Sequence, residues 1–376
     1  MVEIQRVKSK ADYNAFVDLP WSLYKNDPNW VPNLKIALHD IINVNKNPFF
    51  KHALFYPLLA KIDGKVVGRI AGVIDDRYND FHDEQIAFFG FFESINDPAV
   101  SHALFEEVEE WARLKNMKSI MGPMNPSTNH ECGLLVEGFD DPPNVMMTYN
   151  PEYYLPLIEA EGYSKAKDLL AFHLDYSKKF SDRLKAHSER LRQTNRVTIR
   201  QVNMSDYENE VHKIREIYND AWEKNWGFVP MNEEEFDHMA KDMKMILDPE
   251  FILLAEIGNE PIGFALALPD VNQALKKIPN GKLFPFGLLK LLWFLKGPGR
   301  KKALSRVRIV TLGIKKAYQE VGIGPMFYMD FLKTGAKKKL HGEASWILED
   351  NRPMVKALKF MNAEKYKAYR IFDKAL

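Results

Sequence analysis

The sequence predicts an α/β fold (in the α+β sense) made of two similar halves, each a mixed central sheet flanked by helices. The first observation is an internal repeat, because residues 58–75 align without gaps on residues 253–270. The second is that the same order of strands and helices follows each copy. The third is a glycine turn between a strand and a helix in the second half only.

Each copy of the repeat reads as a β-hairpin. Two apolar runs flank a polar turn, Asp63-Gly64 in the first copy and Gly258-Asn259 in the second. Chance similarity between two amphipathic hairpins is the alternative. The ungapped match, and the equivalent elements that follow both copies, disfavour it.

The rest of each half continues the same pattern. A third strand is followed by a helix, a buried strand, a second helix and a final strand. In the first half these are expected at 86–92, 98–115, 118–121, from Asn150-Pro151, and 169–174. In the second half they are expected at 307–314, 325–339, 344–348, from Asn351-Arg-Pro353, and 367–372. Initial strands are expected at 1–6 and 197–202, which gives domains 1–178 and 196–376 joined by a helical linker, 179–195.

Composition narrows the class of protein. The 376 residues are 46% hydrophobic and carry a formal net charge of +1, so no global basic field favours nucleic acid. The single cysteine, Cys132, excludes an internal disulfide and a multi-cysteine zinc site, and no metal is expected. The N-terminus shows no secretory signal, and no apolar run reaches the ~18–20 residues of a spanning helix. A cytoplasmic protein is expected.

The glycine turn, Gln319-Glu-Val-Gly-Ile-Gly324, has the character of a phosphate cradle. Glycines let the backbone approach a ligand closely, and the first N–H groups of the following helix have no intrahelical partner and attract an anion. A simple turn into a helix is the alternative. Pro325 removes one donor from the cradle.

The spacing Gln-x-x-Gly-x-Gly and the order of elements resemble the GNAT superfamily of acyl-CoA N-acyltransferases, and the likeness covers nearly the whole chain. Further segments resemble a bacterial tandem-GNAT group, to which bacterial ceramide synthases look related: 26–32, 47–52, 89–93, 122–127, 131–139 and 348–351. The resemblance implies acetyl-CoA or a longer acyl-CoA as co-substrate. It also implies a CoA site in the second half, formed by Leu312, Gly313, Ile314, Gln319, Val321, Gly322, Ile323, Gly324 and Asn351.

The first half departs from this pattern. Residues 94–100 replace the glycine turn, Asp97 would repel a pyrophosphate, and Pro98 removes a donor. We therefore expect no CoA at the equivalent place in the first half.

Amide formation from a thioester requires a base for the amine proton, an oxyanion donor and, where the thiolate needs it, an acid. Glu349 is the preferred base and Asp350 the second choice, although both could be plain turn acids. The resemblance places the usual tyrosine acid at Leu358, which cannot donate a proton. His130 and Glu131 could form a proton relay, in a polar cluster with Asn125, Asn129 and Cys132; a purely structural loop is the alternative.

An apolar insertion, 270–305, interrupts the second half. Its run 283–295 is followed closely by basic residues, which is typical of an element that docks on a membrane surface. Peripheral contact through 283–308, at the inner face of the membrane, is therefore one interpretation. A tunnel for a long chain and an ordinary packed helix are the others.

The function predicted from these features is acyl transfer from CoA to a primary amine, with a long-chain, sphingoid-like amine as the favoured acceptor. Acetyl transfer to a small amine and a non-catalytic acyl-CoA sensor or scaffold are the alternatives. Transfer from aminoacyl-tRNA, as in Fem-like tandem proteins, is disfavoured by the near-zero net charge.

Overall fold

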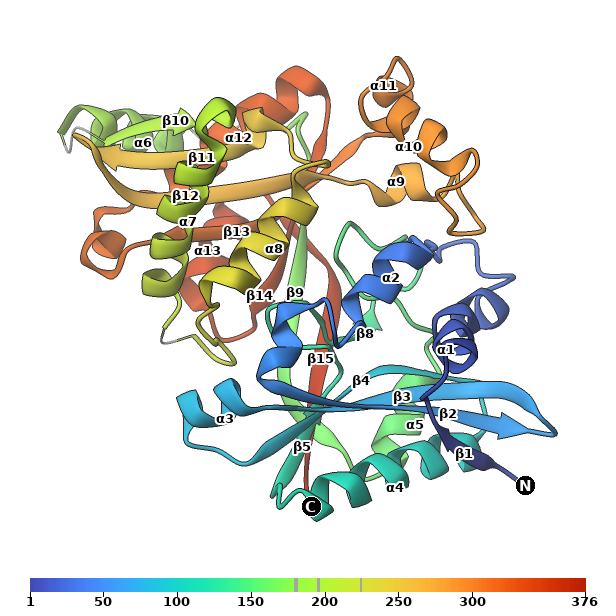
Figure 1. Ribbon diagram of the computed structural model, residues 1–376. Coiled ribbons are helices and arrows are strands. Elements are labelled where there is room, and N and C mark those ends of the chain that lie inside the picture. Colours follow the sequence, from blue (N-terminus) through green and yellow to red (C-terminus); the bar gives the residue numbers. More distant parts are fainter. Residues whose placement is uncertain (179–181, 195–196, 224) are drawn as a thin grey trace. The chain divides into compact units, whose positions relative to one another are not determined.

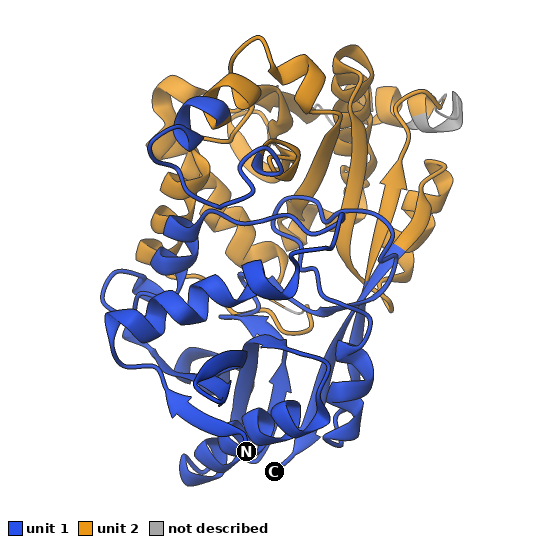
Figure 2. Ribbon diagram, turned by 90° about the vertical axis from the view of Figure 1, so that its right-hand side faces the viewer, with its two compact units in different colours: residues 1–169, 275–290, 367–376 blue, residues 170–274, 291–366 orange. Residues whose placement is uncertain are grey.

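The computed structural model describes residues 1–178, 182–194, 197–223 and 225–376. The chain divides into two compact units, coloured separately in Figure 2. Unit 1 comprises residues 1–169, 275–290 and 367–376, and unit 2 comprises residues 170–274 and 291–366. The last ten residues and part of the insertion therefore belong to the first unit.

The sheet of unit 1 follows the order β1-β2-β3-β4-β5-β15, and β8 also pairs with β15. Its strands are β1 (Glu3–Arg6), β2 (Ala53–Ile62), β3 (Lys65–Asp75), β4 (Ile86–Ser94), β5 (Ser119–Gly122), β8 (Leu134–Glu137) and most of β15 (Glu364–Ala375). A small separate ladder joins β6 (Met124–Asn125) and β7 (Glu131–Cys132). The β2–β3 turn has Asp63 and Gly64 with positive φ, as the two-residue hairpin predicts.

The C-terminal strand is tied to unit 1 by ion pairs. Lys374 Nζ lies 2.7 and 2.8 Å from the two carboxylate oxygens of Glu109, and Arg370 Nε donates to Asp168 at 2.8 Å. Antiparallel pairing with β5 runs from Phe372 opposite Gly122 onward. These contacts give the strand a place that its position in the sequence does not reveal.

The helices of unit 1 cover both faces of the sheet (Figure 1). They are α1 (Lys10–Leu23), α2 (Lys35–Ile41), η1 (Pro48–Lys51), α3 (Asp76–His82), α4 (Pro98–Leu114) and α5 (Tyr154–Ala160). Helix α4 buries Leu104, Phe105 and Val108 on one face, and α1 buries Phe16 and Val17 on the other. Complete burial of such side chains contributes about 1.5–3 kcal/mol each.

The sheet of unit 2 follows the order β14-β13-β12-β11-β10, with residues of β9 beside β14. The strands are β9 (Ser164–Leu174), β10 (Val197–Gln201), β11 (Ile252–Ile257), β12 (Glu260–Pro269), β13 (Arg306–Ile314) and β14 (His341–Leu348). Strands β13 and β14 pair in parallel, and β10 to β13 pair antiparallel. The order repeats that of unit 1, strand for strand.

The helices of unit 2 include the described part of the predicted linker, α6 (Asp182–Thr194). Residues 179–181 and 195 of that linker lie outside the described residues. The others are η2 (Met204–Asp206), α7 (Tyr207–Ala221), α8 (Glu233–Met243), η3 (Pro249–Phe251), α9 (Asn272–Leu275), α11 (Arg300–Ala303), η4 (Lys316–Val321), α12 (Gly324–Lys338) and α13 (Arg352–Phe360). Helix α10 (Gly287–Leu295) begins in residues of unit 1 and ends in residues of unit 2.

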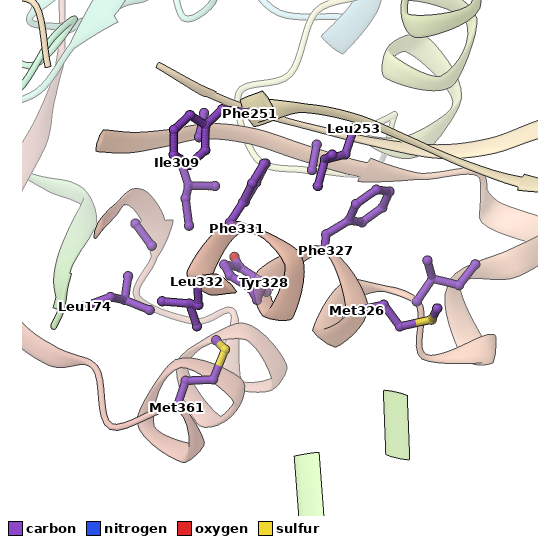
Figure 3. Close-up of a cluster of buried hydrophobic side chains, with 14 of the residues drawn as sticks. Leu174, Phe251, Leu253, Ile309, Met326, Phe327, Tyr328, Phe331, Leu332 and Met361 are labelled. Carbon is purple, nitrogen blue, oxygen red and sulfur yellow. The ribbon is translucent and has the colours of Figure 1, made fainter. Parts of the chain in front are cut away.

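Helix α12 forms the centre of the unit 2 core. Figure 3 shows Phe327 and Phe331 pointing toward the strands that carry Leu253 and Ile309. Leu332 faces the other way, on the side where Met361 lies at the end of α13. The core therefore fixes the start of α12 against the edge of β13.

The structure confirms the predicted fold and the predicted order of elements in both halves. One helix start is wrong: the prediction from Asn150-Pro151 places it too early, since α5 begins at Tyr154. Asn150 is buried and bonds the backbone of Leu135 instead, with Oδ1 accepting from the N–H at 2.7 Å. A side chain used across the fold is not available as a helix cap.

Candidate functional site

The main feature of unit 2 is the point where two parallel strands separate. The register of β13 with β14 ends at Ile309 opposite Ala344, although β13 continues to Ile314. Two residues further along β14, Trp346 has a left-handed φ of +57°, which is uncommon for a large side chain. The backbone edge of β13 beyond Ile309 thus extends past its paired neighbour.

A β-bulge lies at the same point. The pairing of β12 with β13 shifts between Leu266 and Ala267, which face Thr311 and Ile309, so Val310 is the extra residue. Bulges locally bend a strand and re-aim its backbone groups. The separation of β13 from β14 therefore coincides with a built irregularity in β13.

The base of this separation holds a buried ionic cluster. Arg308 is fully buried; its Nε donates to Ser345 Oγ at 2.6 Å and lies 3.8 Å from Glu343 Oε1. Its guanidinium stacks 4.5 Å from the ring centroid of Trp346, and the Tyr366 hydroxyl donates to Glu343. Buried charges need such partners, because removing one leaves the other desolvated and uncompensated.

The predicted glycine turn lies between the 3-10 helix η4 and helix α12. The η4 turn ends at Val321, the following Gly322 has φ +82°, and α12 starts at Gly324. A Cβ on Gly324 would meet nothing closer than 3.9 Å, so no side chain crowds this spot. The N–H of Met326 is bonded to Ile323 O at 2.9 Å, and Pro325 has none. An anion at this helix end would therefore be met by Gly322, Ile323 and Gly324.

Gln319 anchors the turn. Its Nε2 donates to Ile314 O at 3.2 Å and to Ala221 O at 3.3 Å, so it links the end of β13 to the end of α7. The N–H of Lys316 donates to Asp220 Oδ2 at 2.6 Å. The conformation of the cradle is thus set by bonds to β13 and α7.

The remaining predicted CoA residues divide by role. The side chain of Ile323 is buried in the core, and Leu312, Ile314 and Val321 pack against it. Gly313 is required by packing, since a Cβ there would lie 2.7 Å from the Trp222 ring. Asn351 is the N-cap of α13, with its side chain accepting from Met354 N at 3.2 Å. The side chains of these residues are therefore used in packing and capping.

The two predicted bases follow β14 directly. Glu349 and Asp350 are both exposed in the turn before α13. Glu349 lines an open depression of about 500 Å³ with the outer face of α13, formed by Arg352, Val355, Lys356, Lys359 and Phe360. The glycine turn does not line that depression. Leu358, at the place of the usual acid, is buried.

The equivalent strand separation in unit 1 is filled by the chain itself. Pairing of β4 with β5 ends at Phe88 opposite Met121, and the chain then lies against β4. A Cβ on Gly90 would sit 2.7 Å from the carbonyl carbon of Met124 and closer still to its oxygen. Asn125 Oδ1 accepts from the N–H of Phe91 at 2.6 Å. Residues 122–126 thus lie against β4 beyond the point where its pairing with β5 ends.

The helix end that would bind phosphate in unit 1 is also satisfied internally. Asp97 caps α4, and its carboxylate accepts from Ala99 N at 2.9 Å. Tyr154 Oη accepts from Ser94 N at 2.9 Å, and Tyr153 donates to Ser94 O at 2.8 Å. The groups at this helix end of unit 1 are therefore bonded within the protein, whereas the helix start at Gly324 of unit 2 is not crowded by side chains.

A buried carboxylate stands where unit 2 has Gly313. Glu93 accepts hydrogen bonds from the hydroxyls of Tyr24 at 2.7 Å and Tyr154 at 2.8 Å, and lies 3.5 Å from Arg69 Nη2. Burial raises the pKa of Glu93, although Arg69 and both hydroxyls favour the charged form. These bonds connect Tyr24, Tyr154 and Arg69 to β4, so the cluster holds parts of unit 1 together.

The predicted His130–Glu131 relay lies in unit 1. His130 Nδ1 lies 2.8 Å from Ser127 Oγ, and its ring packs edge-on against Phe49. Glu131 and the buried Cys132 form the short strand β7. His130 and Ser127 close a turn, and Asn125 of the same cluster accepts from the backbone of β4 at Phe91.

Several residues of the site were missed from the sequence. They are Glu343, Ser345, Trp346 and Tyr366 at the base of the separation. They surround Arg308, which the sequence analysis included in the surface contact 283–308 and which is fully buried instead. A signal was present, because charged residues inside apolar strands are seldom fully buried unless they are paired. The partner of each charge lies on another strand and could not be assigned.

Two further searches bear on the site. Within the described ranges, no group of three or more His, Cys, Asp or Glu side chains is arranged to hold a metal ion. The part of the chain that the structure describes also has no helix long and apolar enough to cross a membrane.

Comparison with known proteins identifies relatives over the full chain. The sequence is 38% identical over 374 residues to Protein YghO of Escherichia coli (strain K12), covering 98% of this chain and 94% of that protein. It is also 38% identical over 376 residues to the bacterial ceramide synthase of Caulobacter vibrioides (strain NA1000 / CB15N), covering 98% of this chain and 96% of that protein. No family model matches the sequence.

Solved structures share the fold at low identity. A tandem GNAT protein from the clavulanic acid biosynthesis pathway matches with a TM-score of 0.55 and 10% identity, over 100% of this chain and 98% of that one. A GCN5-related N-acetyltransferase from Sphaerobacter thermophilus matches with a TM-score of 0.52 and 12% identity, over 100% and 95%. The chain has the tandem GNAT fold and belongs to the family of the bacterial ceramide synthase and Protein YghO.

Proposed function

We propose that this protein is an acyl-CoA-dependent N-acyltransferase that acylates a long-chain primary amine, using a single acyl-CoA site in unit 2. The observation that carries the proposal is the contrast between the units. Beyond Ile309, β13 runs out of register with β14 and is followed by a glycine turn that is uncrowded at Gly324, whereas beside β4 residues 122–126 lie against the strand.

The residues that would hold the co-substrate follow from that contrast. The N–H groups at Gly322, Ile323 and Gly324 suit the pyrophosphate, and the β13 edge from Val310 to Ile314 suits the amide groups of the pantetheine arm. Bound acyl-CoA supplies an acyl group activated as a thioester.

The acceptor amine must react in its neutral form, so the protein must provide a base that accepts its proton. Glu349 is the proposed base, because it is an exposed carboxylate at the end of β14 with Asp350 beside it. The amine nitrogen forms a bond to the acyl carbon, the bond from that carbon to sulfur breaks, and the amine proton passes to the carboxylate. With Leu358 at the place of the usual acid, the CoA thiolate leaves without a proton from that position, which its pKa near ~8.5 permits.

Sequence similarity to a named relative favours the long-chain acceptor. The relative from Caulobacter vibrioides, 38% identical and matched almost end to end, is named a bacterial ceramide synthase. Acetyl transfer to a small amine and transfer to a sphingoid-like amine differ only in the acceptor and the acyl length, so one assay separates them.

The test is a thiol-release screen of acyl-CoA chain length against a panel of amines that includes sphingoid bases. Turnover is expected with a long-chain amine and not with polyamines or amino acids. Turnover only with acetyl-CoA and a small amine would overturn the proposed acceptor.

A non-catalytic acyl-CoA sensor is the second candidate, and Leu358 is the observation that favours it. It predicts acyl-CoA binding with no thiol release for any amine on the panel. If no acyl-CoA of any length raises the melting temperature, both candidates fail.

A further inference from the structure

The insertion presents the densest group of exposed apolar side chains in the described residues. Five large apolar residues within ten positions are exposed: Phe284 (68%), Phe286 (68%), Leu289 (64%), Leu292 (39%) and Trp293 (54%). The other exposed apolar residues are scattered singly along the chain, which is normal for a protein surface. A concentrated group of this kind marks a binding surface.

Helix α10 is apolar on two opposite faces. Leu288, Leu291 and Leu295 share the face that is turned into the protein, and the last two are almost fully buried. Phe286, Leu289 and Trp293 recur at intervals of three and four residues on the opposite side. Each residue turns a helix by about 100°, so these two stripes lie nearly half a turn apart. One stripe is covered by the chain and the other is exposed.

Lysines flank the exposed stripe. By the same rotation, Lys290 lies on one side of the Leu289–Trp293 line and Lys296 lies on the other, and both are exposed. Lys282 precedes the helix, and Lys301 and Lys302 follow it, all exposed. Lysine heads around an apolar stripe suit a surface with an apolar interior and an anionic boundary.

The local charge is extreme for this chain. From Val271 to Lys302 the sequence holds eight Lys and Arg residues and no Asp or Glu, although the two classes nearly balance over the whole chain; of the eight, Arg300 pairs with the buried Asp248. An ordinary solvated face would mix both signs. The excess of one sign therefore indicates an anionic partner.

The segment is held in a defined conformation. Arg300 Nη2 donates to the buried Asp248 at 2.5 Å, and Lys338 Nζ donates to the same carboxylate at 2.7 Å. A Cβ on Gly299 would lie 2.5 Å from the indole of Trp293, so the chain after α10 folds back closely onto that ring. The exposed stripe is thus a built surface and not a loose loop.

We infer that residues 282–302 dock this protein on the surface of an anionic lipid bilayer, with Phe286, Leu289 and Trp293 inserted among the acyl chains and the lysines among the headgroups. Helix α10 has nine residues, too few to cross a bilayer, so it lies in the interface plane. A second copy of the chain fits less well, because a symmetric contact would bring the two sets of lysines together. Docking would also bring the protein to membrane-held substrates, but the inference does not depend on the acyltransferase activity.

The experiment is co-sedimentation of the full chain with vesicles of phosphatidylcholine alone and of phosphatidylcholine mixed with phosphatidylglycerol. Two variants test the two parts of the surface: Phe286→Ser with Leu289→Ser, and Lys290→Glu with Lys296→Glu. The matched control is Leu114→Ser with Lys115→Glu, an exposed pair at the end of α4. All six changes are at exposed positions, and circular dichroism verifies folding.

The expected result is salt-sensitive binding to the anionic vesicles that falls by about tenfold or more in both variants and is unchanged in the control. Equal binding to neutral and anionic vesicles, or binding that both variants retain, would overturn the inference. So would a native dimer in sedimentation velocity that the Phe286→Ser, Leu289→Ser variant converts to monomer without any vesicle binding by the native chain. Because no arm measures turnover, a failure here is distinct from failure of the proposed activity.

Discussion

Replacing Gly90 by alanine should severely destabilise unit 1, because this glycine is where the chain fills its own strand separation. A Cβ at this position would lie 2.7 Å from the Met124 carbonyl carbon and closer to its oxygen. Both atoms are backbone atoms, so no side-chain rotation relieves the clash. The second unit has Thr311 at the equivalent place in the register, opposite Leu266 as Gly90 is opposite Ala71.

The size of the effect follows from what must move. Overpacking a core typically costs about 1–3 kcal/mol. Displacing residues 122–126 would also weaken the 2.6 Å hydrogen bond from Phe91 N to Asn125 Oδ1. Losing that bond would leave a buried donor unpaired, which costs about 1–3 kcal/mol more. We therefore expect Gly90→Ala to lower the free energy of unfolding by at least about 3 kcal/mol. At roughly 2–4 °C per kcal/mol for a unit of this size, the melting temperature should fall by about 6–12 °C.

The assay is thermal and urea unfolding followed by circular dichroism, with two controls. Gly64 has a left-handed φ of +77° and open space where a Cβ would lie. Gly64→Ala should therefore lower the free energy of unfolding by only about 1–2 kcal/mol. Thr311→Ala should cost less than about 1 kcal/mol. If Gly90→Ala is no less stable than Gly64→Ala, the strand separation of unit 1 is not filled as described.

Four further results are expected. Gly324→Ala should change the free energy of unfolding by no more than about 1 kcal/mol, because the new Cβ has room. It should nevertheless weaken acyl-CoA binding in calorimetry by about fivefold or more. Unchanged affinity would show that Gly324 does not belong to the cradle. Arg308→Phe should lower the free energy of unfolding in urea by about 3–5 kcal/mol, because the buried Glu343 loses its cationic partner. The double variant Arg308→Phe, Glu343→Met copies the Phe88–Met121 pair of unit 1 and should recover most of that loss. A double variant as unstable as the single one would argue against the ion pair. Burial alone would raise the pKa of Glu210, but hydrogen bonds from Arg200 and Lys213 outweigh burial and hold the pKa at about 2. The contribution of Glu210 to the stability of the fold should therefore be complete above pH ~4.5 and be lost as the pH falls toward ~2. Glu210→Gln should flatten that part of the curve of unfolding free energy against pH. Glu349→Gln should lower the thiol-release rate by about 100-fold without changing acyl-CoA affinity, whereas Asp350→Asn should not; the reverse pattern would reassign the base.

Local signals in the sequence predicted most of the fold. The Asp63-Gly64 turn and the starts of α4 at Pro98 and α13 at Arg352 each depend on residues within a few positions, and each is where the sequence predicts it. The repeat then supplied the order of the strands. Gly322 was likewise identified by its place between a strand and a helix, and its φ of +82° shows why a glycine is favoured there.

Contacts between distant parts of the chain could not be predicted in this way. The filling of the first strand separation depends on residues 122–126 reaching back to Gly90, and the ionic cluster depends on Arg308 meeting Glu343 on another strand. The membership of the last strand in unit 1 rests on ion pairs such as Lys374–Glu109. Periodicity along the sequence carries no information about such pairings.

The insertion illustrates the same limit at the surface. Its apolar run predicted a helix, but the run is equally compatible with a packed helix, a tunnel wall or a docking surface. The structure decides how each side chain is exposed: Leu291 and Leu295 are buried, and Leu289 and Trp293 are not. This division shows that the exposed lysines of residues 282–302 flank an exposed apolar stripe.

The central claim is one acyl-CoA site per chain, at the glycine turn of unit 2. Isothermal titration of the native protein with a non-reactive thioether analogue of a long-chain acyl-CoA tests it most directly. The variants are Gly322→Val and the matched Gly258→Val, which has a similar left-handed φ of +63° and open space in the β11–β12 turn. We predict one bound analogue per chain, lost in Gly322→Val and retained in Gly258→Val. Two bound analogues per chain, or undiminished binding by a folded Gly322→Val variant, would contradict the claim.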